Sequence, residues 1–164
     1  PSNALAEVLL GHSGEWVIDP VLSTSSGVRC APNDARSGAY GALWRMADLL
    51  TPNLPEAAEL TGLPRSADPL DLASALRAEG CLRVLIKGGH SDGETVCDYF
   101  VGREGSVTVL RRPRLAGSAR GTGCRLASTI AARRALGDDW EGAVCTAVAA
   151  HDRWLAARLA AAAQ

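Results

Sequence analysis

The feature that most constrains the fold is an alternation of short apolar runs with segments of helical periodicity. Apolar runs at residues 16–21, 48–51 and 82–87 each close on a proline or glycine, and helical patterns at 34–46 and 68–79 lie between them. Short apolar runs that end at such turn residues indicate buried strands. Strands that alternate with helices are typical of a parallel sheet with helices on its faces. We therefore predict an α/β fold.

The second half of the chain continues with a different arrangement. Two β-rich runs, 95–101 and 106–110, flank a glycine-containing turn and predict a hairpin, with a loop expected over 111–120. A helix is predicted over 124–136, where a glycine ends it. The alanine-rich segment 140–163 is expected to be helical as well, either as one helix or broken into two.

Composition excludes several classes of protein. With 164 residues and 47% hydrophobic residues, the chain predicts about one globular domain. It contains no apolar run near the ~20 residues that cross a bilayer, and its start, where residues 5–10 resemble the end of a helix, does not resemble a secretory signal. A net charge of −1 argues against a general nucleic-acid or membrane-surface binder. Five cysteines without a Cys-x-x-Cys pair fit neither a disulfide framework nor a zinc site, so we expect reduced thiols in the cytoplasm.

Polar residues stand where the predicted strands end. Asp19 follows the first run, Thr51-Pro52-Asn53 the second, and Lys87 closes the third. Ligands of open α/β sheets bind at the carboxyl ends of the strands. Asp19 could therefore bind a metal or a polar ligand, although an Asp-Pro turn explains it equally well.

The segment Gly121-Thr122-Gly123-Cys124 opens the predicted helix near residue 124. Glycines allow a close backbone approach to a ligand, and a helix start offers free N–H groups and a positive dipole end, which together favour an anion such as phosphate. A thiol in this first turn is expected to have a lowered pKa. The alternative is an ordinary glycine-rich loop before a helix with a small cysteine.

Asn53 and Glu56 lie three residues apart at the start of a predicted helix. Together they could hold a hydrated Mg²⁺ beside a phosphate. The same spacing is a capping box, and the two roles are compatible.

Lys87 is the only lysine in a chain with 16 arginines. A lysine at a strand end is ordinarily solvated, but this composition suggests a position where arginine cannot serve, such as contact with a nucleotide phosphate. An anion-binding helix start, a carboxylate suited to Mg²⁺, a lysine and a candidate base are the parts that phosphoryl transfer from a nucleotide needs.

Four segments in this order resemble the hydroxymethylpyrimidine phosphate kinases of thiamine biosynthesis, within the ribokinase-like superfamily. They are WVIDPVLSTSSG (16–27), LLTPNLPEAAELTG (49–62), VLIKGGH (84–90) and GTGCRLASTIAARRALG (121–137). The resemblance implies a three-layer α/β/α sandwich with a mostly parallel central sheet. It also implies an ATP- and Mg²⁺-dependent kinase that phosphorylates a hydroxymethylpyrimidine or its monophosphate, and often forms a homodimer.

The resemblance also assigns roles to individual residues. Gly121, Thr122 and Gly123 would form the anion hole for the transferred phosphoryl group, and Cys124 would be the base that takes the substrate proton. Asn53 and Glu56 would organise Mg²⁺ and the nucleotide phosphates. Lys87 would contact the nucleotide, and Asp19 would lie near the phosphate and the metal.

The chain departs from the family pattern in three places. Arg120 stands where the family commonly has histidine, and Ser25 where it usually has lysine. The glycine-rich amino-terminal segment that supplies several strands and most pyrimidine contacts has no counterpart in residues 1–164, so we expect a fragment of a larger chain or a degenerate member. A pyridoxal or pyridoxine kinase and a non-catalytic nucleotide-binding remnant therefore remain alternatives. A cysteine hydrolase using Cys124 is less favoured, because no histidine is paired with it in the sequence.

Overall fold

The sheet contains five strands, in the spatial order β1-β2-β3-β4-β5. In this computed structural model the described residues are 13–24, 26–90, 93–115 and 121–162. The strands are β1 (Val17–Ile18), β2 (Leu49–Leu50), β3 (Val84–Ile86), β4 (Thr95–Val101) and β5 (Val107–Pro113). The α/β prediction is confirmed, because helices separate the first three strands along the chain.

Four of the five strands run in the same direction. β1 pairs parallel with β2 and β2 with β3, whereas β3–β4 and β4–β5 are antiparallel, so that β4 alone in this sheet is reversed. The sheet is thus mixed through one strand, and the expectation of a mostly parallel sheet is confirmed. The cause of the reversal is the predicted hairpin, whose short turn forces its two strands to run in opposite directions.

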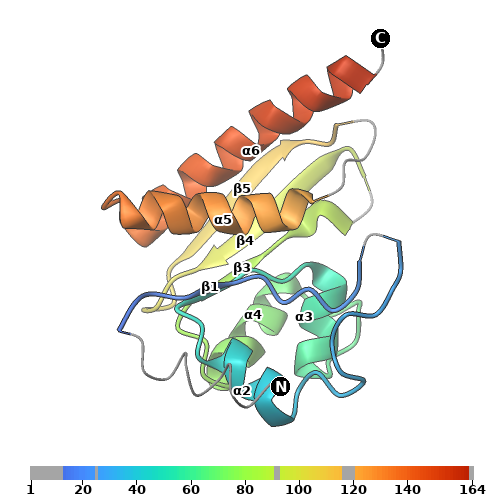
Figure 1. Ribbon diagram of the computed structural model, residues 1–164, viewed down its shortest axis with the longest axis vertical. Coiled ribbons are helices and arrows are strands. Elements are labelled where there is room, and N and C mark those ends of the chain that lie inside the picture. Colours follow the sequence, from blue (N-terminus) through green and yellow to red (C-terminus); the bar gives the residue numbers. More distant parts are fainter. Residues whose placement is uncertain (1–12, 25, 91–92, 116–120, 163–164) are drawn as a thin grey trace.

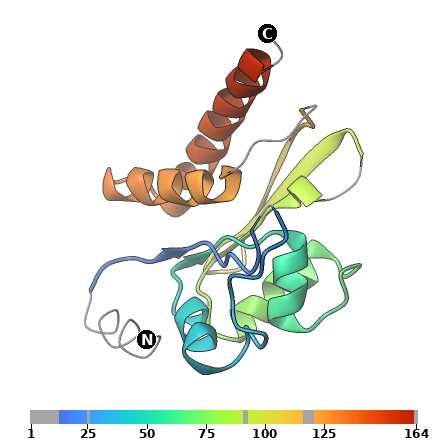
Figure 2. The same cartoon turned by 45° about the vertical axis from the view of Figure 1, so that its right-hand side comes forward.

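Helices cover both faces of the sheet and complete three layers. Helices α2 (Gly38–Arg45), α3 (Leu54–Thr61) and α4 (Pro69–Ala78) lie on one face, and α5 (Thr122–Ala135) and α6 (Trp140–Ala162) on the other, as Figures 1 and 2 show. The alanine-rich segment forms one continuous helix, α6, rather than two. Among the described helices, none combines the length and the apolar character that a bilayer crossing requires.

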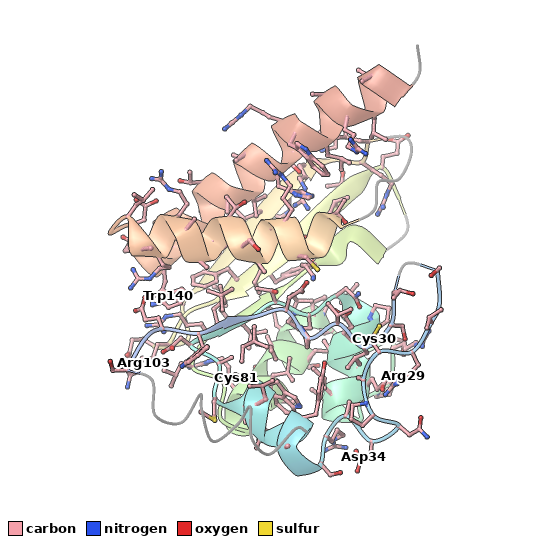
Figure 3. All side chains as sticks on the ribbon, viewed as in Figure 1. Arg29, Cys30, Asp34, Cys81, Arg103 and Trp140 are labelled. Atoms are coloured by element: carbon pink, nitrogen blue, oxygen red, sulfur yellow. The ribbon has the colours of Figure 1, made fainter. Side chains whose placement is uncertain are left out.

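The two faces of the sheet each pack into a separate apolar core. Val84 and Ile86 of β3 pack with α2, α3 and α4, while Leu85 between them packs with α5 and α6. This alternation follows from the two-residue period of a strand. Figure 3 shows Cys81 on the first side of the sheet and Trp140 on the second.

The first strand is shorter than predicted, and its two residues are half-buried rather than buried. At its start, the Trp16 N–H donates to the Asp48 carboxylate at 2.8 Å instead of to a neighbouring strand. After it comes Pro20, which has no N–H to continue a ladder. The Asp48 carboxylate, distant in sequence, and Pro20 therefore limit β1 at its two ends.

Two other boundaries differ from prediction. Helix α2 begins at Gly38, because the Asp34 carboxylate accepts the Arg36 N–H at 3.0 Å and holds a turn there instead. Residues 111–113, expected in a loop, extend β5, since Arg111, Arg112 and Pro113 all pair with β4. The predicted helix end at 5–10 and residues 116–120 of the predicted loop lie outside the described residues.

Candidate active site

Three strand ends meet at one edge of the sheet. The Lys87 ammonium, after β3, lies 2.7 Å from Oδ1 of Asp19, which follows β1. The hydroxyl of Thr51, after β2, donates to the same oxygen at 3.1 Å. The side chains of Lys87 and Asp19 are only 15% and 11% exposed, and Thr51 is fully buried. Lys87 is therefore a paired, largely desolvated cation rather than a solvated surface lysine.

The backbone of Lys87 ties this pair to the start of α3. Its N–H donates to the Pro52 carbonyl at 2.8 Å, and Lys87 forms an isolated parallel bridge with Asn53. Asn53 is the N-cap of α3. The cap of one helix and the lysine of the next strand are thus fixed side by side.

The start of α5 packs directly against the Asp19–Lys87 pair. A Cβ built on Gly123 would lie 3.0 Å from the Lys87 Nζ and 3.3 Å from Oδ2 of Asp19, a spacing that leaves little room for a side chain. Gly121 caps the helix with a φ of 74°, a left-handed conformation that favours glycine. The first N–H groups of a helix have no partners within it, so its positive end is directed toward this edge of the sheet. The predicted anion site therefore lies beside a built-in ammonium group.

Cys124 differs from its predicted electrostatic state. The residue is exposed, yet partial burial of its sulfur is the largest cause of a raised thiol pKa. The Asp19 carboxylate adds to the rise, both by its charge and by a side-chain hydrogen bond with the thiol, whereas Lys87 opposes it. The expectation of a lowered pKa is wrong, because the carboxylate and the desolvation outweigh the favourable charges nearby.

Asn53 and Glu56 form the predicted capping box. The Glu56 N–H donates to Oδ1 of Asn53 at 2.9 Å, and the Asn53 N–H donates to Oε2 of Glu56 at 2.8 Å. Glu56 is only 9% exposed. Its burial raises its carboxyl pKa, and the charge of Asp19 raises it further, while the Asn53 hydrogen bond and Lys87 lower it.

This charge pattern suits a divalent cation. The charges of Asp19 and Glu56 repel each other, and Lys87, which is ion-paired with Asp19, also lowers the pKa of Glu56. An added cation would offset the negative charge that remains and relieve the cost of burying Glu56. No group of three or more potential metal-ligating side chains occurs in the described parts of the chain. Mg²⁺ would therefore be held by few side chains, with water and phosphate completing its shell, as is usual for that ion.

Two residues around this edge were not predicted as site residues. Thr51 belongs to the segment Thr51-Pro52-Asn53 after the second strand, but its role as the second donor to Asp19 was not expected. Asp98 in β4 is fully buried and accepts the Gly88 N–H at 2.8 Å. The signal for it was an acid at an inward-facing place in an alternating strand, between the buried Val96 and Phe100. Two departures from the family pattern, Ser25 and Arg120, lie outside the described residues.

The known sequences that match this chain agree with the kinase resemblance found in its motifs. The family model described as phosphomethylpyrimidine kinase matches residues 2–162. A hydroxymethylpyrimidine/phosphomethylpyrimidine kinase of Haemophilus influenzae is 35% identical over 141 residues, which make up 82% of this chain and 52% of that protein. The chain thus spans about half the length of the curated relatives it matches.

Solved structures resemble the fold closely. The pyridoxal kinase of Lactobacillus plantarum superposes with a TM-score of 0.82 at 25% identity, covering 97% of this chain and 59% of that one. The pyridoxal kinase of Staphylococcus aureus in complex with AMP-PCP and pyridoxal gives a TM-score of 0.74 at 27% identity, covering 89% of this chain and 54% of that one.

Proposed function

The chain belongs to the phosphomethylpyrimidine kinase family, and we propose that it carries the phosphoryl-transfer site of an ATP- and Mg²⁺-dependent kinase. The proposed acceptor is the hydroxymethyl group of a pyrimidine or of its monophosphate, as in thiamine biosynthesis. The observation that carries the proposal is the start of α5 packed against the Asp19–Lys87 pair at the ends of three strands. Helix N–H groups and an ammonium side by side would supply the positive charge that a transferring phosphoryl group needs, and this supports the proposal.

Each site residue then has a definite task. The N–H groups around Gly121, Thr122 and Gly123 stabilise the negative charge of the transferred group. Lys87, held by Asp19, contributes its positive charge to the nucleotide phosphates as a compact point charge. Because Gly123 has no side chain, the helix start can approach this ammonium closely.

Cys124 is the proposed base. As the substrate oxygen attacks the γ-phosphorus, the bond to the β–γ bridging oxygen breaks and ADP leaves, while the hydroxyl proton passes to the Cys124 sulfur in its thiolate form. Since the thiol pKa is raised, only a minority of molecules hold the thiolate at neutral pH, and the rate is expected to increase with pH. This pH dependence distinguishes the proposed base from a spectator cysteine.

Glu56, Asp19 and Asn53 are the residues proposed to organise Mg²⁺ and the phosphates. When bound, the ion would screen the phosphate charges during transfer. The protein's own contribution is the placement of Glu56 by the capping box: the Asn53 N–H donates to its carboxylate, and its backbone N–H donates to Oδ1 of Asn53.

Pyridoxal or pyridoxine is the second candidate substrate. The solved structures that resemble this chain include a pyridoxal kinase in complex with pyridoxal, at 27% identity. A third reading is a non-catalytic nucleotide-binding remnant. We place the protein in the cytoplasm as a homodimer that binds ATP and a small pyrimidine, but neither nucleic acid nor a membrane.

The test is a phosphate-transfer assay on the full-length protein with ATP and Mg²⁺. Hydroxymethylpyrimidine, its monophosphate and pyridoxal are compared by kcat/KM, and Cys124→Ala is compared with Cys145→Ala, which alters a half-buried cysteine of α6. We expect transfer to the pyrimidine that Cys124→Ala abolishes and Cys145→Ala leaves intact. Full activity in Cys124→Ala would overturn the assignment of the base. Preference for pyridoxal would favour the second reading, and ATP binding without turnover the remnant.

A further inference from the structure

Asp98 is a buried acid that the proposed chemistry does not use. Of the described residues, only Thr51, Glu56, Asp98 and His151 are polar or charged and buried, and Asp98 is 0% exposed. An ionised carboxylate in such a position is costly unless charges and hydrogen bonds compensate for the lost water. Its partners therefore indicate what it is there to hold.

One carboxylate oxygen of Asp98 accepts a hydrogen bond, and the other lies in an ion pair without hydrogen-bond geometry. Oδ1 accepts the Gly88 N–H at 2.8 Å. Oδ2 lies 2.6 Å from Nη1 of Arg112, and Nε of Arg112 lies 2.8 Å from the Asp152 carboxylate of α6. The arginine balances the buried charge, and this leaves the first oxygen to fix a backbone amide.

That backbone amide immediately follows Lys87. A Cβ on Gly88 would come within 1.9 Å of the Cys97 carbonyl oxygen, so the chain at this point lies directly on the backbone of β4. On the other side, the Lys87 N–H is bound to Pro52. Two successive backbone amides, those of Lys87 and Gly88, are thus held from opposite sides. The Pro52 carbonyl beyond β2 binds the first, and Asp98 binds the second.

We propose that Asp98 is a positioning residue: by binding the Gly88 N–H it fixes the origin of the Lys87 side chain and so keeps its ammonium against Asp19 and the start of α5. The consequence for catalysis rests on the kinase function proposed above. The position of the ammonium is a separate matter that can be measured without turnover. Asp98 touches neither substrate nor nucleotide in this scheme.

Lys87 itself provides the measurement that does not need turnover, because it is the only lysine in residues 1–164 and its side chain is only 15% exposed beside Asp19 and the start of α5. The rate at which an N-hydroxysuccinimide ester acetylates Lys87 in the full-length protein, followed by peptide mass analysis, reports how firmly its ammonium is held there. If Asp98 fixes the origin of this side chain, Asp98→Ala should raise the acetylation rate of Lys87 several-fold.

Two further variants separate positioning from general destabilisation. Asp98→Glu keeps the charge beside Arg112, and hence the fold, but its longer side chain displaces the oxygen from Gly88. Asp98→Glu replaces Asp98→Ala in this measurement if Asp98→Ala fails to fold. Asp152→Asn removes the other carboxylate on Arg112 without touching Gly88, and is the matched control. We expect Asp98→Glu to raise the acetylation rate of Lys87 and Asp152→Asn to leave it unchanged.

Activity supplies the second measurement. With kinase turnover established, Asp98→Glu should lower kcat by about 10- to 100-fold, the effect of a displacement near 1 Å, with Asp152→Asn within about twofold of wild type. The proposal is overturned if Asp98→Glu leaves the acetylation rate of Lys87 at its wild-type value, or if Asp152→Asn matches Asp98→Glu. A wild-type protein without turnover would refute the kinase function, while the acetylation result would still decide the role of Asp98.

Discussion

Gly88→Ala tests how tightly the chain after Lys87 is packed. The added Cβ would stand 1.9 Å from the Cys97 carbonyl oxygen and 2.8 Å from the carbonyl carbon, both backbone atoms that no rotamer change can move. To restore ordinary contact, the backbones at Gly88 and Cys97 must separate by about 1 Å, because real Cβ atoms essentially never approach closer than 3.0 Å. That separation stretches the hydrogen bond from the Gly88 N–H to Asp98.

The expected cost follows from two contributions. Overpacking against rigid neighbours costs about 1–3 kcal/mol, and weakening a hydrogen bond to a charged group costs about 1.5–3 kcal/mol. Together they predict a loss of about 3–5 kcal/mol in the free energy of unfolding, measured by urea denaturation. A fall in Tm of roughly 10 °C should accompany it for a domain of this size.

Gly89→Ala is the matched control. A Cβ at Gly89 has no neighbour within 4 Å, and its φ is not in the left-handed region. It should therefore leave the free energy of unfolding within about 0.5 kcal/mol of wild type. If Gly88→Ala were as mild as Gly89→Ala, the close approach to β4 would be refuted, and with it the route by which Asp98 is proposed to act.

Three more outcomes are expected. Lys87→Arg should lower kcat despite its retained charge, because the larger guanidinium has no room between Asp19 and Gly123; an unchanged kcat would contradict this. Glu56→Gln should change the pH dependence of stability. Burial raises the Glu56 pKa, so the native state binds the proton more tightly, and the stabilising contribution of Glu56 is lost as pH rises above 4.5. Urea denaturation should show that the variant lacks this contribution; the same pH dependence in both proteins would contradict it. Leu85→Ala, at a fully buried core position, should cost about 2–5 kcal/mol in the same assay; a loss below 1 kcal/mol would contradict the packing described.

The predicted order of elements agrees with the structure because periodicity and turn residues are local signals. The capping box of Asn53 and Glu56 and the hairpin depend on spacings of a few residues, and both are present. Element ends were predicted less well. β1 is trimmed by the Asp48 carboxylate, a contact across 32 residues that a local pattern does not encode.

The candidate site was likewise predictable only in part. The strand-end rule brings Asp19 and Lys87 together, although 68 residues separate them, because parallel neighbours finish at one edge. The electrostatic state of Cys124 was not predictable, because it depends on which charge lies nearest, and here Asp19 and desolvation prevail over Lys87. Asp98 was not predicted, because a single acid in a strand does not indicate which backbone amide it will bind.

The shortness of β2 has a consequence for how the chain finds its alignment. Its two residues, Leu49 and Leu50, are identical and both fully buried, one in each core. A slip of one position in one direction would put Leu50 in the place of Leu49 and the equally buried Thr51 in the place of Leu50, so burial alone discriminates poorly against that pairing. The discrimination must come from the polar contacts just beyond the strand: Thr51 with Asp19, and the bridge between Asn53 and Lys87. The groups proposed for chemistry would then also set the register of β2 in the sheet. Their replacement should broaden the ensemble of folded states as well as slow the reaction.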